Sequence, residues 1–293
     1  MKAAVAILLV AAALAACDRP AGVTAQSDGP RQRLPQRPAQ RIVSIDFCAD
    51  QFLLRLVERD RILAVSPDAD AKFSYMREAA QGLRKVRPNA EDVLALKPDL
   101  IVRSYGGGPR ATAFFERAGT PVLNVGWAPD VASTLRVTMD VAAGLGATTA
   151  GEAVVDETQA RLDAIDDALA SEDPERRKIL YLTTGGVTTG PGSLIHDIIA
   201  RSGHANYMRT PGWRSIPLED LAGSPPDAVA AGFFDTPDLH LSAWSAARHP
   251  IARRLVDEVP TVRLDGAWTA CGGWFVIDAI EALAGADSGN GPS

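Results

Sequence analysis

Two segments of the chain follow the same plan, and this repetition constrains the fold. Residues 91–99 have the sequence E-D-V-L-A-L-K-P-D, and residues 219–227 have the sequence E-D-L-A-G-S-P-P-D. Each segment opens with Glu-Asp, closes with Pro-Asp and continues into an apolar run. One such segment predicts a short helix that leads into a buried strand. Two of them predict two lobes built alike, with a cleft between them that suits a ligand.

The first residues predict export from the cytoplasm. Lys2 is followed by an apolar run and then by Leu-Ala-Ala-Cys17. This order is typical of a signal peptide, and the run is shorter than the about 20 apolar residues that a membrane span needs. The residues before Cys17 resemble the bacterial lipobox, in which the cysteine becomes a lipidated N-terminus. A plain secretory signal with a chance cysteine is the alternative.

The predicted lipid would hold the protein at a membrane surface without a spanning helix. Residues 1–17 are therefore interpreted as a lipoprotein signal peptide. Asp18 resembles the inner-membrane retention signal of enteric bacteria, which implies periplasmic anchoring at the inner membrane rather than the outer membrane. Residues 18–40 contain four prolines and few large apolar side chains, which predicts a flexible tether. Residues 286–293 predict a disordered tail. The net charge of −6, without a basic block, disfavours nucleic-acid binding. We also expect the protein to be a monomer.

Short β-branched runs alternate with helical stretches along the rest of the chain. The predicted strands are residues 41–45, 61–65, 99–102, 121–125, 178–182, 227–231 and 261–264. The predicted helices include residues 110–118, 129–144, 150–171, 193–201 and 273–284. This alternation predicts an α/β fold with two Rossmann-like lobes, mostly parallel sheets and a long connecting helix. The expected boundaries are 41–148 for the N-terminal lobe, 149–173 for the helix and 174–285 for the C-terminal lobe.

Three stretches resemble one protein family. They are residues 41–45 (R-I-V-S-I), residues 89–101 around Glu91, and residues 190–203 (G-P-G-S-L-I-H-D-I-I-A-R-S-G). The chain resembles the helix-linked periplasmic substrate-binding proteins of ABC importers, which carry cobalamin or ferric siderophores. The resemblance implies capture of a metal chelate (cobalamin, ferric siderophore or haem), delivery to a permease and its ATPase, and no enzymatic activity. The alternatives are an anchored sensory or accessory protein and, less favoured, an α/β enzyme with Cys48 as nucleophile.

The same resemblance assigns a role to the two repeated segments. In the family, one acidic residue on each lobe docks onto arginines of the permease, and the matching positions are Glu91 and Glu219. Charges on separate lobes would mainly orient and accelerate docking. The alternative is that each glutamate only stabilises the first turn of a helix through the helix dipole.

Ligands of open α/β sheets bind at the carboxyl ends of the strands, and this rule nominates the candidate ligand contacts. Loop tryptophans suit a large, rigid and partly apolar ligand, although we expect at least two of the five to support packing instead. The residues after the first strand, Asp46–Gln51, depart from the family's usual sequence, so the identity of the ligand does not transfer. The candidates are Asp46, Phe47, Cys48, Tyr105, Trp127, Trp213, Phe233, Trp268, Cys271 and Trp274.

Cys48 and Cys271 have three alternative interpretations: a disulfide between the lobes, two free thiols in the cleft, or unrelated buried cysteines. An exported protein favours the disulfide, which requires Cα atoms within about 7 Å. The four histidines show no paired ligand spacing, so no direct metal site is expected. The glycine-rich stretch 185–191 lacks the lysine of a phosphate loop, and no G-x-S-x-G elbow occurs. No cofactor is expected.

Overall fold

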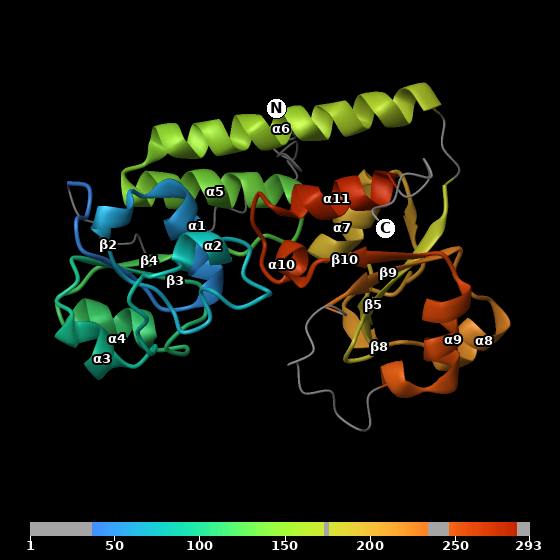
Figure 1. The fold of residues 1–293 in the computed structure, drawn as a ribbon, viewed down its shortest axis with the longest axis horizontal. Coiled ribbons are helices and arrows are strands. Elements are labelled where there is room, and N and C mark those ends of the chain that lie inside the picture. The colour runs from blue at the N-terminus through green and yellow to red at the C-terminus, as the bar shows by residue number, and fades with distance from the viewer. Residues whose placement is uncertain (1–36, 173–175, 234–245, 286–293) are drawn as a thin grey trace, which may run out of the picture. The chain divides into compact units, whose positions relative to one another are not determined.

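The computed structural model describes residues 37–172, 176–233 and 246–285, and all of them belong to one compact unit, Gln32–Ser293 (Figure 1). The predicted signal peptide with Cys17, most of the predicted tether and the C-terminal tail lie outside the described residues. In the part of the chain that is described, no helix is both long enough and apolar enough to cross a membrane.

The N-terminal lobe is a four-stranded parallel sheet with helices around it. Its strands are β1 (Ile42–Ser44), β2 (Ile62–Ala64), β3 (Leu100–Arg103) and β4 (Val122–Asn124), in the order β2-β1-β3-β4. Its helices are α1 (Phe47–Leu56), the 3-10 turn Arg59–Arg61, α2 (Arg77–Ala80), α3 (Ala90–Ala95), α4 (Ala111–Arg117) and α5 (Val131–Leu145). The strands are apolar because helices cover both faces of such a sheet.

The folded body begins before Arg41, the boundary expected from the sequence. Ala39 is only 4% exposed, and its carbonyl oxygen accepts a hydrogen bond from Arg61 Nε at 2.8 Å. The N–H of Gln40 donates to the Asp99 carboxylate, also at 2.8 Å. Composition alone assigned these residues to the tether, because the contacts that fix them come from residues far along the chain.

Helix α6 (Thr148–Glu172) connects the lobes, close to the predicted range 149–173. It runs along α5 at one end and along α11 (Val276–Ala284) at the other (Figure 1). A Cβ added to Gly151 would lie 2.4 Å from Ala142 Cβ, so the glycine lets α5 and α6 approach closely. Farther along α6, the Arg161 guanidinium pairs with Glu281 of α11. The connecting helix is therefore held against both lobes.

The C-terminal lobe repeats the parallel plan. Its sheet has the order β10-β9-β5-β7, built from β5 (Lys178–Thr183), β7 (Ala205–Asn206), β9 (Ala228–Gly232) and β10 (Thr261–Leu264). The helices are α7 (Leu194–Arg201), α8 (Leu218–Gly223), the 3-10 turn Ala246–Arg248, α9 (Pro250–Glu258), α10 (Gly266–Thr269) and α11. The predicted fold, two lobes with mostly parallel sheets joined by a long helix, is confirmed.

A small antiparallel ribbon in this lobe was not predicted. It pairs β6 (Val187–Thr189) with β8 (Trp213–Ser215). All three residues of β8 are exposed, so the strand has no alternation of buried and exposed side chains from which a strand can be predicted.

Candidate ligand-binding cavity

A cavity of about 730 Å³ lies between the two lobes. This volume is in the range of sites that enclose most of a small-molecule ligand. The N-terminal lobe contributes the start of α1 and the loops after β3 and β4, and the C-terminal lobe contributes the start of α7, the start of β8 and the α10–α11 loop. Six of the predicted contacts line it: Phe47, Cys48, Tyr105, Trp127, Trp213 and Cys271.

Asp46 is a structural residue rather than one of the lining residues. It is 3% exposed, and its Oδ1 accepts from the Ala49 N–H at 2.9 Å, which caps α1. Its Oδ2 accepts from the three successive N–H groups of residues 104–106, at 2.7, 3.1 and 2.8 Å. The structure does not place Asp46 among the described lining residues: its carboxylate binds the loop after β3 to the start of α1.

The same loop is fixed by two further residues that the sequence did not single out for this role. A Cβ on Gly106 would lie 2.5 Å from the Ile45 carbonyl oxygen, so this position requires glycine. Arg103 is 8% exposed and donates to the carbonyl oxygens of Gly106 at 2.8 Å and Gly108 at 3.1 Å. Together they hold Tyr105 at the cavity.

Three exposed aromatic side chains from the two lobes line the cavity. Trp127, in the loop after β4, is 83% exposed, Trp213 at the start of β8 is 57% exposed and Tyr105 is 54% exposed. The Trp213 ring meets the buried Tyr181 edge-on, with centroids 6.2 Å apart. Burial raises the pKa of the Tyr105 phenol, which therefore stays neutral at physiological pH. Exposed aromatic side chains that gather at one cavity are typical of a binding site.

Other predicted contacts lie elsewhere. Trp274 is 6% exposed and packs edge-on against Phe52, with centroids 5.4 Å apart, so it is a core residue. Trp268 lies half-buried in α10 against the core and is not among the lining residues. Phe233 has a φ of +65° after β9 and directly precedes the undescribed residues 234–245. Phe233 and Trp268 fall in predicted loops and Trp274 at the start of a predicted helix, where no periodicity shows which side faces the core.

The described part of the cavity wall is mostly apolar. Among the described residues that line it, none is Asp, Glu, Lys, Arg or His, and the polar groups are hydroxyls such as those of Ser104, Ser193 and Thr269. Within the described ranges, no three His, Cys, Asp or Glu residues lie close enough to hold a metal ion. The described part of the wall can therefore hold a large apolar ligand, and none of its residues is an ionic partner for a charged one.

Cys48 and Cys271 form a disulfide with Cα atoms 5.6 Å apart. Cys48 is the second residue of α1, and Cys271 lies in the loop between α10 and α11. Of the three alternatives, the structure has the disulfide. The disulfide leaves Cys48 without the free thiol that an enzyme with Cys48 as nucleophile would require.

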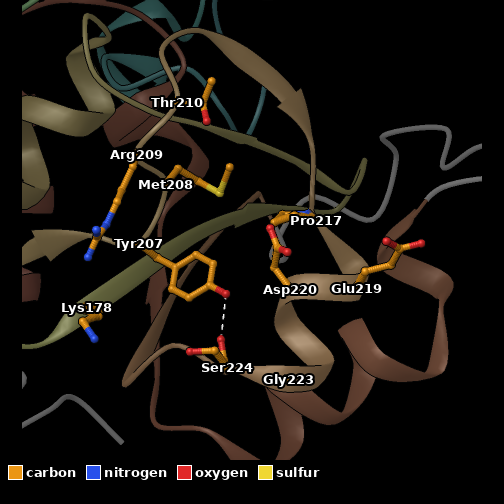
Figure 2. A pocket seen from close by; sticks show the side chains of 10 residues that line it. All are labelled: Lys178, Tyr207, Met208, Arg209, Thr210, Pro217, Glu219, Asp220, Gly223 and Ser224. Atoms are coloured by element: carbon orange, nitrogen blue, oxygen red, sulfur yellow. Dashed lines mark hydrogen bonds between the residues drawn. The ribbon is translucent and has the colours of Figure 1, made fainter.

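Glu91 and Glu219 lie in different lobes, each exposed in the first turn of a short helix, α3 and α8. Figure 1 shows these helices well apart. Glu219 is at the rim of a second cavity of about 560 Å³ that Lys178, Arg209 and Asp220 also line (Figure 2). Figure 2 shows the Asp220 and Glu219 carboxylates pointing in different directions. Glu219 is thus available to a partner from outside.

Comparison with known proteins agrees with this architecture. The chain belongs to the periplasmic binding protein family, which it matches over residues 42–231. A cobalamin-binding protein of Halobacterium salinarum is 26% identical over 198 residues, 66% of this chain and 54% of the relative. The match therefore spans about half the length of that relative.

Solved structures show the same fold. A periplasmic heme binding protein from Pseudomonas aeruginosa has a TM-score of 0.66 at 22% identity, covering 87% of this chain and 94% of the other. A periplasmic vitamin B12 binding protein of Vibrio cholerae has a TM-score of 0.62 at 19% identity, covering 86% and 97%. The family consists of binding proteins rather than enzymes, and membership places the protein outside the cytoplasm.

Proposed function

We propose that this protein captures an uncharged metal chelate of the cobalamin class between its lobes and delivers it to an ABC importer. The observation that carries the proposal is the cavity itself, with aromatic side chains from both lobes and no charged side chain among its described lining residues. The cobalamin-binding protein of Halobacterium salinarum supports the choice of ligand class.

The chemistry of the wall separates the candidate ligands. Haem carries two propionates and many ferric siderophores carry net negative charge, and a carboxylate taken from water needs an ionic or strong hydrogen-bonding partner. Arg103, a buried cation at the end of β3, already donates to carbonyl oxygens and to the side chains of Thr112 and Asn124. A corrinoid such as cyanocobalamin has no net charge, and its large apolar faces suit Trp127 and Trp213.

Delivery would use the two glutamates at the outer ends of the lobes. Trp213 begins β8 and Glu219 lies at the start of α8, so only residues 214–218 separate a cavity residue from a docking residue. A ligand that contacts Trp213 would therefore lie close along the chain to the start of α8. This short connection supports docking of the loaded protein to permease arginines.

The anchor belongs to the same proposal. Lipid on Cys17, with the following residues as a tether, would keep the folded body near the inner membrane and its permease. At about 5–6 Å × √n, a tether of this length reaches some tens of ångströms, enough to clear the lipid headgroups. The protein would act there as a monomer.

The test is a tryptophan-fluorescence titration of the purified protein with cyanocobalamin, hemin, and ferric catecholate and hydroxamate siderophores. We expect cyanocobalamin to bind most tightly and to quench fluorescence less in Trp127→Phe and Trp213→Phe variants. Tight binding of hemin or of an anionic siderophore, without binding of cyanocobalamin, would overturn the assignment.

A further inference from the structure

The disulfide is part of the cavity wall and joins its two sides. Cys48 stands on the α1 side and Cys271 on the α10–α11 side, and both line the cavity. They are separated by 223 residues in sequence, and the chain between them passes through both sheets and α6. The lobes are thus joined covalently twice: through the chain at α6 and through this disulfide at the cavity.

Each cysteine stands on a rigid support. Helix α1 is capped by Asp46, which also binds the loop after β3, and Gln51 Oε1 accepts from the Met76 N–H at 2.7 Å. On the other side, Trp274 and Phe275 follow Cys271 within one short turn and are buried. A movement that separates the cysteines would therefore carry the walls with them.

Non-covalent contacts also join these segments, and one of them lies at the cavity. Phe52 of α1 lines the cavity and packs edge-on against Trp274 of the α10–α11 loop, with centroids 5.4 Å apart. Tyr75 stacks on Phe275 with centroids 4.8 Å apart, and its hydroxyl donates to Asp278 Oδ2 at 2.8 Å. Asp278 also pairs with Arg161 of α6. Tyr75, Phe275 and Asp278 are not among the described lining residues, and the disulfide is the covalent cross-link between the described walls at the cavity.

We propose that Cys48 and Cys271 are positioning residues of the binding site, whose disulfide fixes the separation of the cavity walls before any ligand arrives. Disulfides span Cα–Cα distances up to about 6.8 Å. From the observed 5.6 Å, the walls can separate at this point by only about 1 Å while the bond is intact. A preformed cavity binds more tightly because ligand binding does not have to order its walls.

The proposal makes ligand affinity depend on the redox state. Outside the cytoplasm the disulfide forms and persists. A phosphine such as tris(2-carboxyethyl)phosphine cleaves it to two thiols and is itself oxidised to the phosphine oxide, with oxygen and protons from water. The reduced protein keeps its other lobe contacts but loses the cross-link at the cavity.

The first measurement needs no ligand, so it stays informative if the proposed ligand class is wrong. Spin labels on non-natural residues at the exposed positions 117 and 253, one in α4 and one in α9, report the distance between the lobes. We expect a narrow distribution in the oxidised protein and a broader one, shifted to longer distances, in Cys48→Ser and Cys271→Ser alike. The matched control is Tyr75→Phe, which removes the hydroxyl bond to Asp278 and should leave the distribution narrow.

The second measurement is affinity for cyanocobalamin, by tryptophan fluorescence, before and after phosphine treatment of the unaltered protein. We expect on the order of tenfold weaker binding after reduction, because the walls must then be ordered on binding. Because this measurement uses the unaltered protein, it can still be made if the serine variants fail to fold. An unchanged distance distribution in the folded variants and in the reduced protein would overturn the proposal, whatever the ligand proves to be.

Discussion

Asp227 exchanges two hydrogen bonds with Lys178: its carboxylate accepts the Lys178 N–H at 2.7 Å, and its own N–H donates to the Lys178 carbonyl oxygen at 2.9 Å. Asp99 does the same with Arg41 in the other lobe, at 2.8 and 3.0 Å. The Pro-Asp that closes each repeated segment therefore joins the starts of two neighbouring parallel strands. The two repeated sequence segments therefore form the same strand junction, one in each lobe.

Asp99→Ala should lower the stability of the protein more than Asp227→Ala. The Asp99 carboxylate accepts two N–H groups, from Gln40 and Arg41, whereas Asp227 accepts one from Lys178 and is more exposed. Hydrogen bonds to charged groups contribute about 1.5–3 kcal/mol, and less where solvent competes. We expect urea unfolding to show a loss of about 2 kcal/mol for Asp99→Ala and about 1 kcal/mol for Asp227→Ala. Asp99→Asn, which keeps one acceptor oxygen, should fall between wild type and alanine; equal losses in both alanine variants would contradict this account.

Asp50 should make the stability of the protein depend on pH. Its side chain is fully buried in α1, where it accepts hydrogen bonds from the Ser66 N–H and hydroxyl. Burial raises the pKa of Asp50 from 3.8 to about 6, although the bonds from Ser44 and Ser66 oppose the shift. Because the folded-state pKa is the higher one, the contribution of Asp50 is complete below about pH 4 and is lost as the pH rises through about 6.

The measurement is the difference in free energy of unfolding between wild type and Asp50→Asn at several pH values. A shift of about two pKa units corresponds to roughly 3 kcal/mol, so wild type should lose up to that amount relative to the asparagine variant between about pH 4 and pH 7. Because asparagine does not titrate, the difference between the two free energies of unfolding at each pH removes the pH dependence that all other groups contribute. A difference that stays constant over this range would show that the carboxyl has an ordinary pKa.

Removal of Trp213 should weaken ligand binding with little loss of stability, whereas removal of Trp274 should lower the stability of the fold. Trp213 is 57% exposed at the cavity, so Trp213→Ala should change the free energy of unfolding by less than about 1 kcal/mol while weakening ligand binding on the order of tenfold. Trp274 is buried between Phe52, Tyr75 and Phe275, so Trp274→Ala should cost about 3–5 kcal/mol of stability. Urea unfolding and ligand titration of both variants check the contrast. A large stability loss in Trp213→Ala would mean that its role is structural.

The docking proposal is tested by Glu91→Ala combined with Glu219→Ala. Both side chains are exposed and do not line the ligand cavity, so ligand affinity in solution should be unchanged. Uptake by proteoliposomes that contain the importer should fall at least about tenfold at low salt, because the paired charges orient and accelerate docking. Glu116→Ala combined with Glu258→Ala removes one exposed charge from each lobe as the matched control. Normal uptake by the first double variant would rule out docking through these glutamates.

The elements of the fold could be predicted from local patterns. The strands at 42–44 and 178–183 lie in apolar runs, and a run of 25 residues from Thr148 forms one helix. These signals are local, since burial on both faces selects apolar runs and one buried helix face selects a period of 3.6 residues. Strand β8 was missed because it is short and wholly exposed.

The sequence by itself determined the two-lobed plan, the two repeated segments that end at Asp99 and Asp227, and the loops that reach the cavity. Only the tertiary structure decided which loop residues face the cavity, because a loop has no periodicity that separates its two sides. Asp46 turned inward to bind backbone N–H groups, Trp274 packed into the core, and Trp127 and Trp213 remained exposed. The pairing of Cys48 with Cys271 was likewise decided by the packing of α1 against the α10–α11 loop, a contact between residues 223 positions apart.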